Sequence, residues 1–246
     1  MNSFAELKLD IIAFTVSAAM VAGYYLFLHF KGRSDPTYTI HRVNALARRL
    51  WVENVMRNPN KDVMAVQTLR NFIMGSSLMA STAALLVMGT LTLSGQADNI
   101  AQSWHALSLG GSYSSQLWIL KVMLLLVDFI VAFFAFALSI RLANHVLFMV
   151  NIPAHDAHHS LAPRAVARRL NRAGHMFAVG MRAFFFAIPL VFWLFGPWYL
   201  LLASTTLVFT LHHLDRSDSL EELESESLAE PRQSPVISMQ QAKRAT

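Results

Sequence analysis

The sequence predicts an all-α membrane protein: four transmembrane helices, an amphipathic interfacial helix and a disordered acidic C-terminal tail. Of the 246 residues, 54% are hydrophobic and only 14% are charged, whereas soluble domains carry about a quarter charged residues. Four apolar stretches are long enough to cross a hydrocarbon core. The basic residues gather between these stretches, which is typical of cytoplasmic loops.

The charge and the cysteine content exclude several classes of function. A net charge of +5 and a pI near 9.8 are compatible with nucleic-acid binding, but the basic residues belong to loops between apolar stretches, so no nucleic-acid partner is predicted. The chain has no cysteine. It therefore forms no disulfide and has no thiolate nucleophile or cysteine-ligated metal.

The first predicted span covers residues 11–30. Lys31 and Arg33 follow it directly, whereas a signal peptide carries its positive charge before the apolar run. We therefore expect a retained anchor with its N-terminus outside. Residues 40–57 repeat apolar side chains at helical spacing with charged ones opposite, which predicts a helix in the cytoplasmic headgroup layer.

The second predicted span, residues 72–93, follows a polar segment and contains no ionisable side chain. Ser76, Ala80 and Ala84 recur at four-residue spacing on one face of this span. Small residues so placed let another helix approach closely, and that helix is expected in this chain, in a second copy (a homo-dimer) or in a partner. The eight Lys or Arg residues of 31–70 indicate the inside, and residues 94–115, which have none, the outside.

The third predicted span covers residues 116–143, and its apolar segment continues to residue 150. Two charges lie within it. Lys121 is close enough to the outer end to reach water by snorkelling. Asp128 falls near the middle of the membrane, where a charge is costly.

The last predicted span covers residues 183–211. A short basic helix at 163–172, with Pro163 and Gly174 as start and stop signals, precedes it. Pro189 and Gly196-Pro197 interrupt the span, so it is either one kinked helix or two short limbs. We favour one kinked helix, which places the C-terminus outside. Residues 1–213 then form a single domain, and residues 214–246 form the disordered tail.

Several motifs resemble the family of multi-pass membrane proteins catalogued as domain of unknown function 599. They are WVE at 51–53, AVQTLRNFIMGSS at 65–77, SIRLANHVLFMVNIP at 139–153, RRLNRAGHMFAVGMRAFFFAIPL at 168–190 and WLFGP at 193–197. The resemblance runs through residues ~10–215 and implies a multi-pass membrane fold. It implies no catalytic residue, cofactor or substrate.

Polar residues at the inner ends of three spans form the main candidate site. The guanidinium fork of arginine suits phosphate and carboxylate, so the cluster predicts a pocket for an anionic phospholipid headgroup or a small anion. The alternative is that these arginines only anchor helix ends to lipid phosphates. The candidate residues are Gln67, Arg70, Asn71, Arg141, Asn171, Arg172 and Arg182.

Asp128 is the second candidate, as a proton or cation site in the membrane. The alternative is a hydrogen bond between helices, for example to Ser76, Ser77 or Ser81. Nucleotide-binding and hydrolase motifs are missing from the sequence. We therefore expect no catalytic residue, no metal site and no cofactor.

The predicted function is a non-catalytic protein of the cell membrane (the inner membrane in a Gram-negative cell), acting as a small carrier or as an accessory or lipid-binding subunit. The alternative is a membrane enzyme or redox subunit. It would use Asp128, or histidines such as His29 and His145 near the inner ends of spans. The HDAHH run at 155–159 lacks the HExxH arrangement and predicts at most a weak metal site.

Overall fold

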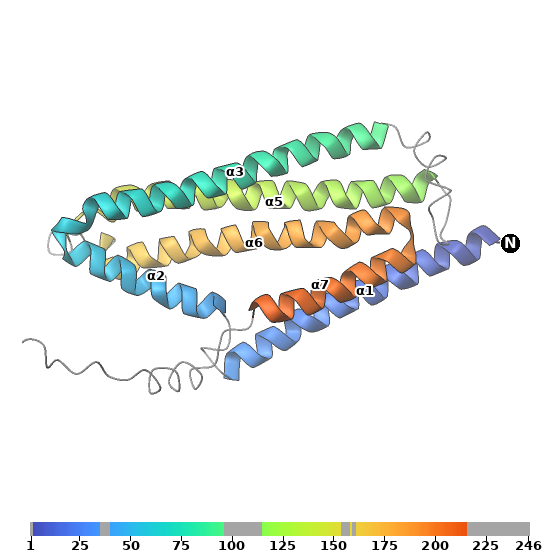
Figure 1. Ribbon diagram of the computed structural model, residues 1–246, viewed down its shortest axis with the longest axis horizontal. Helices are drawn as coiled ribbons and strands as arrows, with labels where there is room; N and C mark the ends of the chain where they lie inside the picture. Colours follow the sequence, from blue (N-terminus) through green and yellow to red (C-terminus); the bar gives the residue numbers. More distant parts are fainter. Residues whose placement is uncertain (1, 35–39, 96–114, 154–157, 159–160, 216–246) are drawn as a thin grey trace, which may run out of the picture.

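Long helices make up the structure, a computed structural model that describes residues 2–34, 40–95, 115–153, 158 and 161–215 (Figure 1). Nearly all of the predicted C-terminal tail lies outside the described residues. The elements are α1 (Asn2–Ser34), α2 (Ile40–Arg57), the short 3-10 helix η1 (Pro59–Lys61), α3 (Asp62–Gly95), α5 (Ser115–Met149), α6 (Pro163–Phe195) and α7 (Pro197–Asp215).

The helices lie roughly along one axis, so the molecule has two ends (Figure 1). We call one of them the basic end: α5 finishes there, α3 and α6 begin there, and α2 lies beside them. The helices α1 and α7 also finish on this side of the molecule, but less far along the axis. At the opposite end, α1, α5 and α7 begin, and α3 and α6 finish. Each of α3, α5 and α6 is about 50 Å long at helical rise, so each exceeds a hydrocarbon core of ~30 Å.

Four helices are long and apolar enough to cross a membrane: α1 through Leu7–Leu28, α3, α5 and α6. This confirms a helical membrane protein with four such helices. No strand occurs in the described residues. α7 is also apolar, and its 19 residues reach about 28 Å.

Small side chains let α3 pack closely on the other helices of its own chain. Ala80 and Ala83 of α3 share a core cluster with Ala132 and Phe136 of α5. Ser76 is fully buried, and Ala80 is nearly so. Two of the three small residues predicted to admit another helix are therefore covered inside this chain.

The predicted amphipathic helix has the bounds expected from the sequence, Ile40–Arg57. One apolar side packs on the bundle, because Val52, Val55 and Met56 join a buried cluster with residues of α3, α5 and α6. Leu46 and Leu50, on the rest of α2, are exposed. At this end α2 is therefore part of a four-helix core rather than a helix lying on the membrane surface alone.

The predicted basic helix begins at Pro163 as expected but does not stop at Gly174, because α6 continues without a break to Phe195. Gly174 instead lets the Arg48 side chain of α2 approach the backbone of α6 closely. A Cβ atom placed there would lie 2.8 Å from Arg48 Cζ of α2. The glycine is thus explained by what packs against it, not by a helix end.

The chain reverses at Gly196-Pro197, which differs from the single kinked span favoured from the sequence. Gly196 has φ 149°, a conformation that favours glycine, and α7 starts at Pro197. α7 then runs back toward the basic end alongside α1 (Figure 1). Ser204 donates to the Leu200 carbonyl, which leaves Ser17 of α1 to donate to Ser204. Asp215 consequently lies at the basic end, so the expectation that the chain leaves the bundle at the opposite end is not met.

Candidate functional site

Three of the predicted arginines lie at one depth in the bundle. Arg70, Arg141 and Arg172 are each about 12–14 Å from the basic end of their own helix at helical rise. A contact between two helices supports this alignment, because Ser139 of α5 donates to the Ala173 carbonyl of α6 at 2.9 Å. We call these three residues the arginine level.

The arginine level faces outward. All three side chains are exposed, as are the predicted Gln67 and Asn71 of α3. Among the described residues, no hydrogen bond or ion pair joins the three guanidinium groups to another side chain. The structure therefore gathers the predicted cations around one rim of the bundle without closing a pocket over them.

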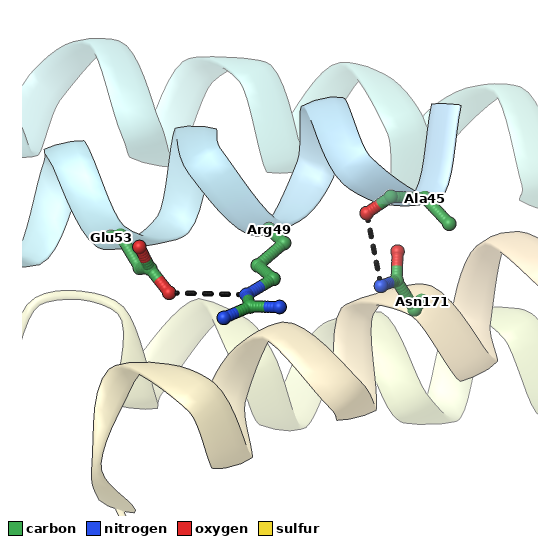
Figure 2. A network of polar contacts seen from close by, with 4 residues as sticks. All are labelled: Ala45, Arg49, Glu53 and Asn171. Atoms are coloured by element: carbon green, nitrogen blue, oxygen red, sulfur yellow. Dashed lines mark hydrogen bonds and ion pairs between the residues drawn. The ribbon is translucent and has the colours of Figure 1, made fainter. Parts of the chain in front are cut away.

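Asn171 lies inward, at the contact between α2 and α6. Its Nδ2 atom donates to the Ala45 carbonyl at 3.1 Å (Figure 2), and its Oδ1 atom accepts from Arg48 Nε at 2.8 Å. Figure 2 also shows Arg49 paired with Glu53 within α2, at 3.2 Å. Asn171 thus holds α2 on α6, a positioning role that the sequence pattern did not reveal.

Further polar contacts line the same seam between α2 and α6. Half-buried Arg48 lies against Gly174, and burial lowers the pKa of its guanidinium group because desolvation disfavours the charged form. His41 and His175 meet with their Nε2 and Nδ1 atoms 3.4 Å apart. The seam therefore concentrates positive and titratable groups close to the arginine level.

Arg182, the remaining predicted residue, lies deeper. It is about 15 Å further along α6 than Arg172. Its guanidinium group lies 5.2 Å from the centre of the Tyr25 ring of α1. Arg182 therefore does not share the depth of Arg70 and Arg141, and it packs α1 on α6.

A buried polar cluster at the opposite end was not predicted. Lys121 of α5 pairs with Asp10 of α1 at 2.9 Å, and Trp193 Nε1 of α6 donates to the same Asp10 oxygen at 2.9 Å. Asp10 is fully buried and Lys121 is 5% exposed. The expectation that Lys121 snorkels to water is therefore wrong. An ion partner supplied by α1 lets the ammonium group stay inside.

The helix end explains why the cluster forms at this point. The Trp193 carbonyl would normally accept from the amide four residues later, but that residue is Pro197, which has no N–H. Lys121 Nζ donates to this carbonyl at 3.2 Å, together with the amide of Gly196. Pro197 in the sequence therefore indicated that the Trp193 carbonyl would lack its usual donor. It did not indicate that Lys121 would replace that donor.

Asp128 lies within α5 and has a buried Oδ2 atom with no hydrogen-bond partner among the described residues. The suggested bond to Ser76 is not formed, because the Ser76 hydroxyl donates to the Phe72 carbonyl of its own helix at 2.9 Å. Nor do Ser77 or Ser81 satisfy this oxygen within the described part of the chain.

The histidines show no metal centre in the described residues, where no three His, Asp or Glu side chains gather to hold an ion. His145 is exposed on α5. His155 and His159, and the side chain of His29, lie outside what the structure describes.

Comparison with protein-family models matches residues 12–219 to the family described as "Protein of unknown function, DUF599". The chain belongs to the DUF599 family. The match confirms the resemblance found in the motifs and covers every described residue of the arginine level, the seam and Asp128. Asp10 lies just before the matched segment of this DUF599 protein. Searches of curated proteins and of solved structures found no match.

Proposed function

We propose that this DUF599 protein is a non-catalytic multi-pass membrane protein whose basic end binds anionic phospholipid headgroups. The arginine level carries the proposal. Three helices present Arg70, Arg141 and Arg172 at one depth, all exposed and without a protein carboxylate partner in the described residues. Unpaired guanidinium groups on an outer rim suit phosphates that approach from the side.

The spacing of charges along α5 supports a lipid rather than a soluble ligand. Lys121 lies about 30 Å from Arg141 at helical rise, which is the thickness of a hydrocarbon core. A bilayer with its far boundary at the Asp10–Lys121 pair therefore has its other headgroup layer at the arginine level. The positive-inside pattern of the sequence would make that layer the cytoplasmic one.

The test compares lipid retention by native mass spectrometry after purification in detergent. Replacement of all three arginines (Arg70→Gln, Arg141→Gln and Arg172→Gln) is expected to weaken retention of phosphatidylglycerol by about tenfold or more, and to leave phosphatidylcholine unchanged. Binding by the native chain should also fall as salt rises, because exposed charges are screened.

The matched control removes three exposed arginines from the same end that lie closer to the end of their own helices: Arg57→Gln, Arg164→Gln and Arg168→Gln. It changes the net charge equally and should retain the lipid. Equal losses in both variants would show a nonspecific charge effect and contradict the proposal. Displacement of the lipid by glycerol phosphate would instead indicate a site for a soluble anion.

A further inference from the structure

Two aspartates lie at different depths of the bundle, Asp10 fully buried and Asp128 partly buried, and their surroundings are opposite. Asp10 has a cation at 2.9 Å and an indole N–H at 2.9 Å. Asp128 has neither, and its buried Oδ2 atom lacks any donor among the described residues. Asp128 lies about 10 Å from Lys121 and about 20 Å from Arg141 along α5, and so falls inside the predicted hydrocarbon layer.

Several buried hydroxyl groups of the bundle already donate to backbone carbonyls. Thr90 of α3 donates to the Leu86 carbonyl, Ser139 of α5 to the Ala173 carbonyl, and Ser204 of α7 to the Leu200 carbonyl. Ser76 likewise donates within its own helix. The buried Oδ2 atom of a carboxylate at Asp128 would therefore carry negative charge without a donor in the described residues, which is more costly than a neutral acid inside the membrane.

Other charges near this depth do not neutralise Asp128. On α5 itself, Lys121 is paired with Asp10, the only acid that α1 brings to that cluster in the described residues. On α6, Arg182 lies over the Tyr25 ring and forms no ion pair with Asp128. The apolar part of α3, residues 72–93, and residues 197–211 of α7 contain no Asp, Glu, Lys, Arg or His.

We propose that Asp128 is a proton-binding site inside the membrane, protonated at neutral pH and able to exchange its proton. The ligand is a hydrogen ion rather than a metal cation, because a hard cation needs several oxygen ligands and no three His, Asp or Glu side chains gather in the described residues to hold one. This site is independent of lipid binding at the arginine level.

A hydrophobic carbodiimide tests the protonation state directly. The acid transfers its proton to one reagent nitrogen while its oxygen bonds to the central carbon, and an oxygen-to-nitrogen acyl shift then gives a stable N-acylurea. The whole reagent is retained and nothing leaves. In proteoliposomes treated with dicyclohexylcarbodiimide, peptide mass spectrometry should find the adduct on Asp128 and not on Asp10.

The labelling rate should fall as pH rises, and sodium ions should give no protection. Asp128→Asn should lose the adduct, whereas Asp10→Asn should keep it. Equal labelling of the two aspartates, a rate independent of pH, or protection by sodium would overturn the proposal.

Infrared spectroscopy gives a second measurement that does not depend on reagent access. The native protein at neutral pH should show the C=O band of a neutral carboxylic acid, and Asp128→Asn should lack it. If Asp128→Asn does not fold, Asp128→Glu should keep the band at a shifted frequency. Absence of an acid band from the native protein would overturn the proposal even if labelling fails for lack of access.

Discussion

Lys121 shows how one residue is kept inside an apolar bundle by partners distant in the sequence. Asp10 supplies the opposite charge, and Trp193 contributes a carbonyl acceptor, a ring at 5.0 Å and an N–H to Asp10. Both charges are therefore satisfied as a set. Removing the charge of Lys121 or of Asp10 leaves the other charge buried without its ion partner.

This arrangement predicts a double-mutant result. Lys121→Met should lower the free energy of unfolding by about 3–5 kcal/mol, because Asp10 stays buried and loses the ammonium group at 2.9 Å. Adding Asp10→Asn should recover most of that loss, since no charge then remains. Denaturant unfolding in micelles, followed by helical circular dichroism, measures both. A double variant as unstable as Lys121→Met alone would contradict the explanation.

The sequence could not reveal this cluster, although it showed each member. Trp193 is separated from Asp10 by 183 residues and from Lys121 by 72. Nothing local indicates which helices meet. The arginine level was easier to predict because apolar runs locate helix ends by themselves, and Arg182 was misplaced because α6 is one long helix rather than a short one followed by a span.

Among the helices, α6 contacts most of the others, and its glycines mark two close approaches. At Gly180 a Cβ atom would lie 2.7 Å from the Phe136 ring of α5, and that ring is fully buried. At Gly174 the obstacle is the far end of the Arg48 side chain, which can move. The two positions look alike in sequence and differ in what surrounds them.

Gly180→Ala should therefore destabilise the bundle by about 1–3 kcal/mol through overpacking, whereas Gly174→Ala should cost clearly less. Gly89→Ala on α3 is the control, because no atom lies within 4 Å of its added Cβ and alanine favours helix. Thermal unfolding of the three variants in one detergent compares them. A similar loss at Gly174 and Gly180 would argue against tight packing of α5 on α6.

Local signals explain which element boundaries were predictable. The helix α2 ends at Arg57, just before Asn58-Pro59, and α6 begins at Pro163; both boundaries are as expected, because proline acts on its immediate neighbours. Gly196-Pro197 likewise predicted a break in the helix, but it did not predict the direction in which the next helix runs. That direction depends on α1, whose Ala13 shares a buried cluster with Trp193 and Leu200.

At the scale of the whole molecule, the reversal at Gly196 decides the side on which α7 ends. Because the chain has no cysteine, single cysteines report position without background. Asn60→Cys and His213→Cys, both exposed at the basic end, should react with an impermeant maleimide from the same side of the membrane. Gly95→Cys, exposed at the opposite end, should react from the other side.

The single kinked span at residues 183–211, favoured from the sequence, predicts a different labelling side for His213→Cys. It places His213 on the side of Gly95, so the labelling pattern of His213→Cys separates the two topologies. Reaction of His213→Cys and Gly95→Cys from one side would rule out the reversal.

The pairing of α1 with α7 also constrains how the protein is made. Ser17 and Ser204, which bond across this pair, are 187 residues apart, so α1 enters the bilayer long before the ribosome has synthesised its main partner. Until α7 is made, the apolar surface of α1 alone must keep this helix in lipid. Asp10 gains its bonds to Lys121 and Trp193 only after α5 and α6 have been synthesised. If the nascent chain were released before residue 197, α1 would be inserted without α7. We expect membrane quality-control proteases to degrade such a fragment.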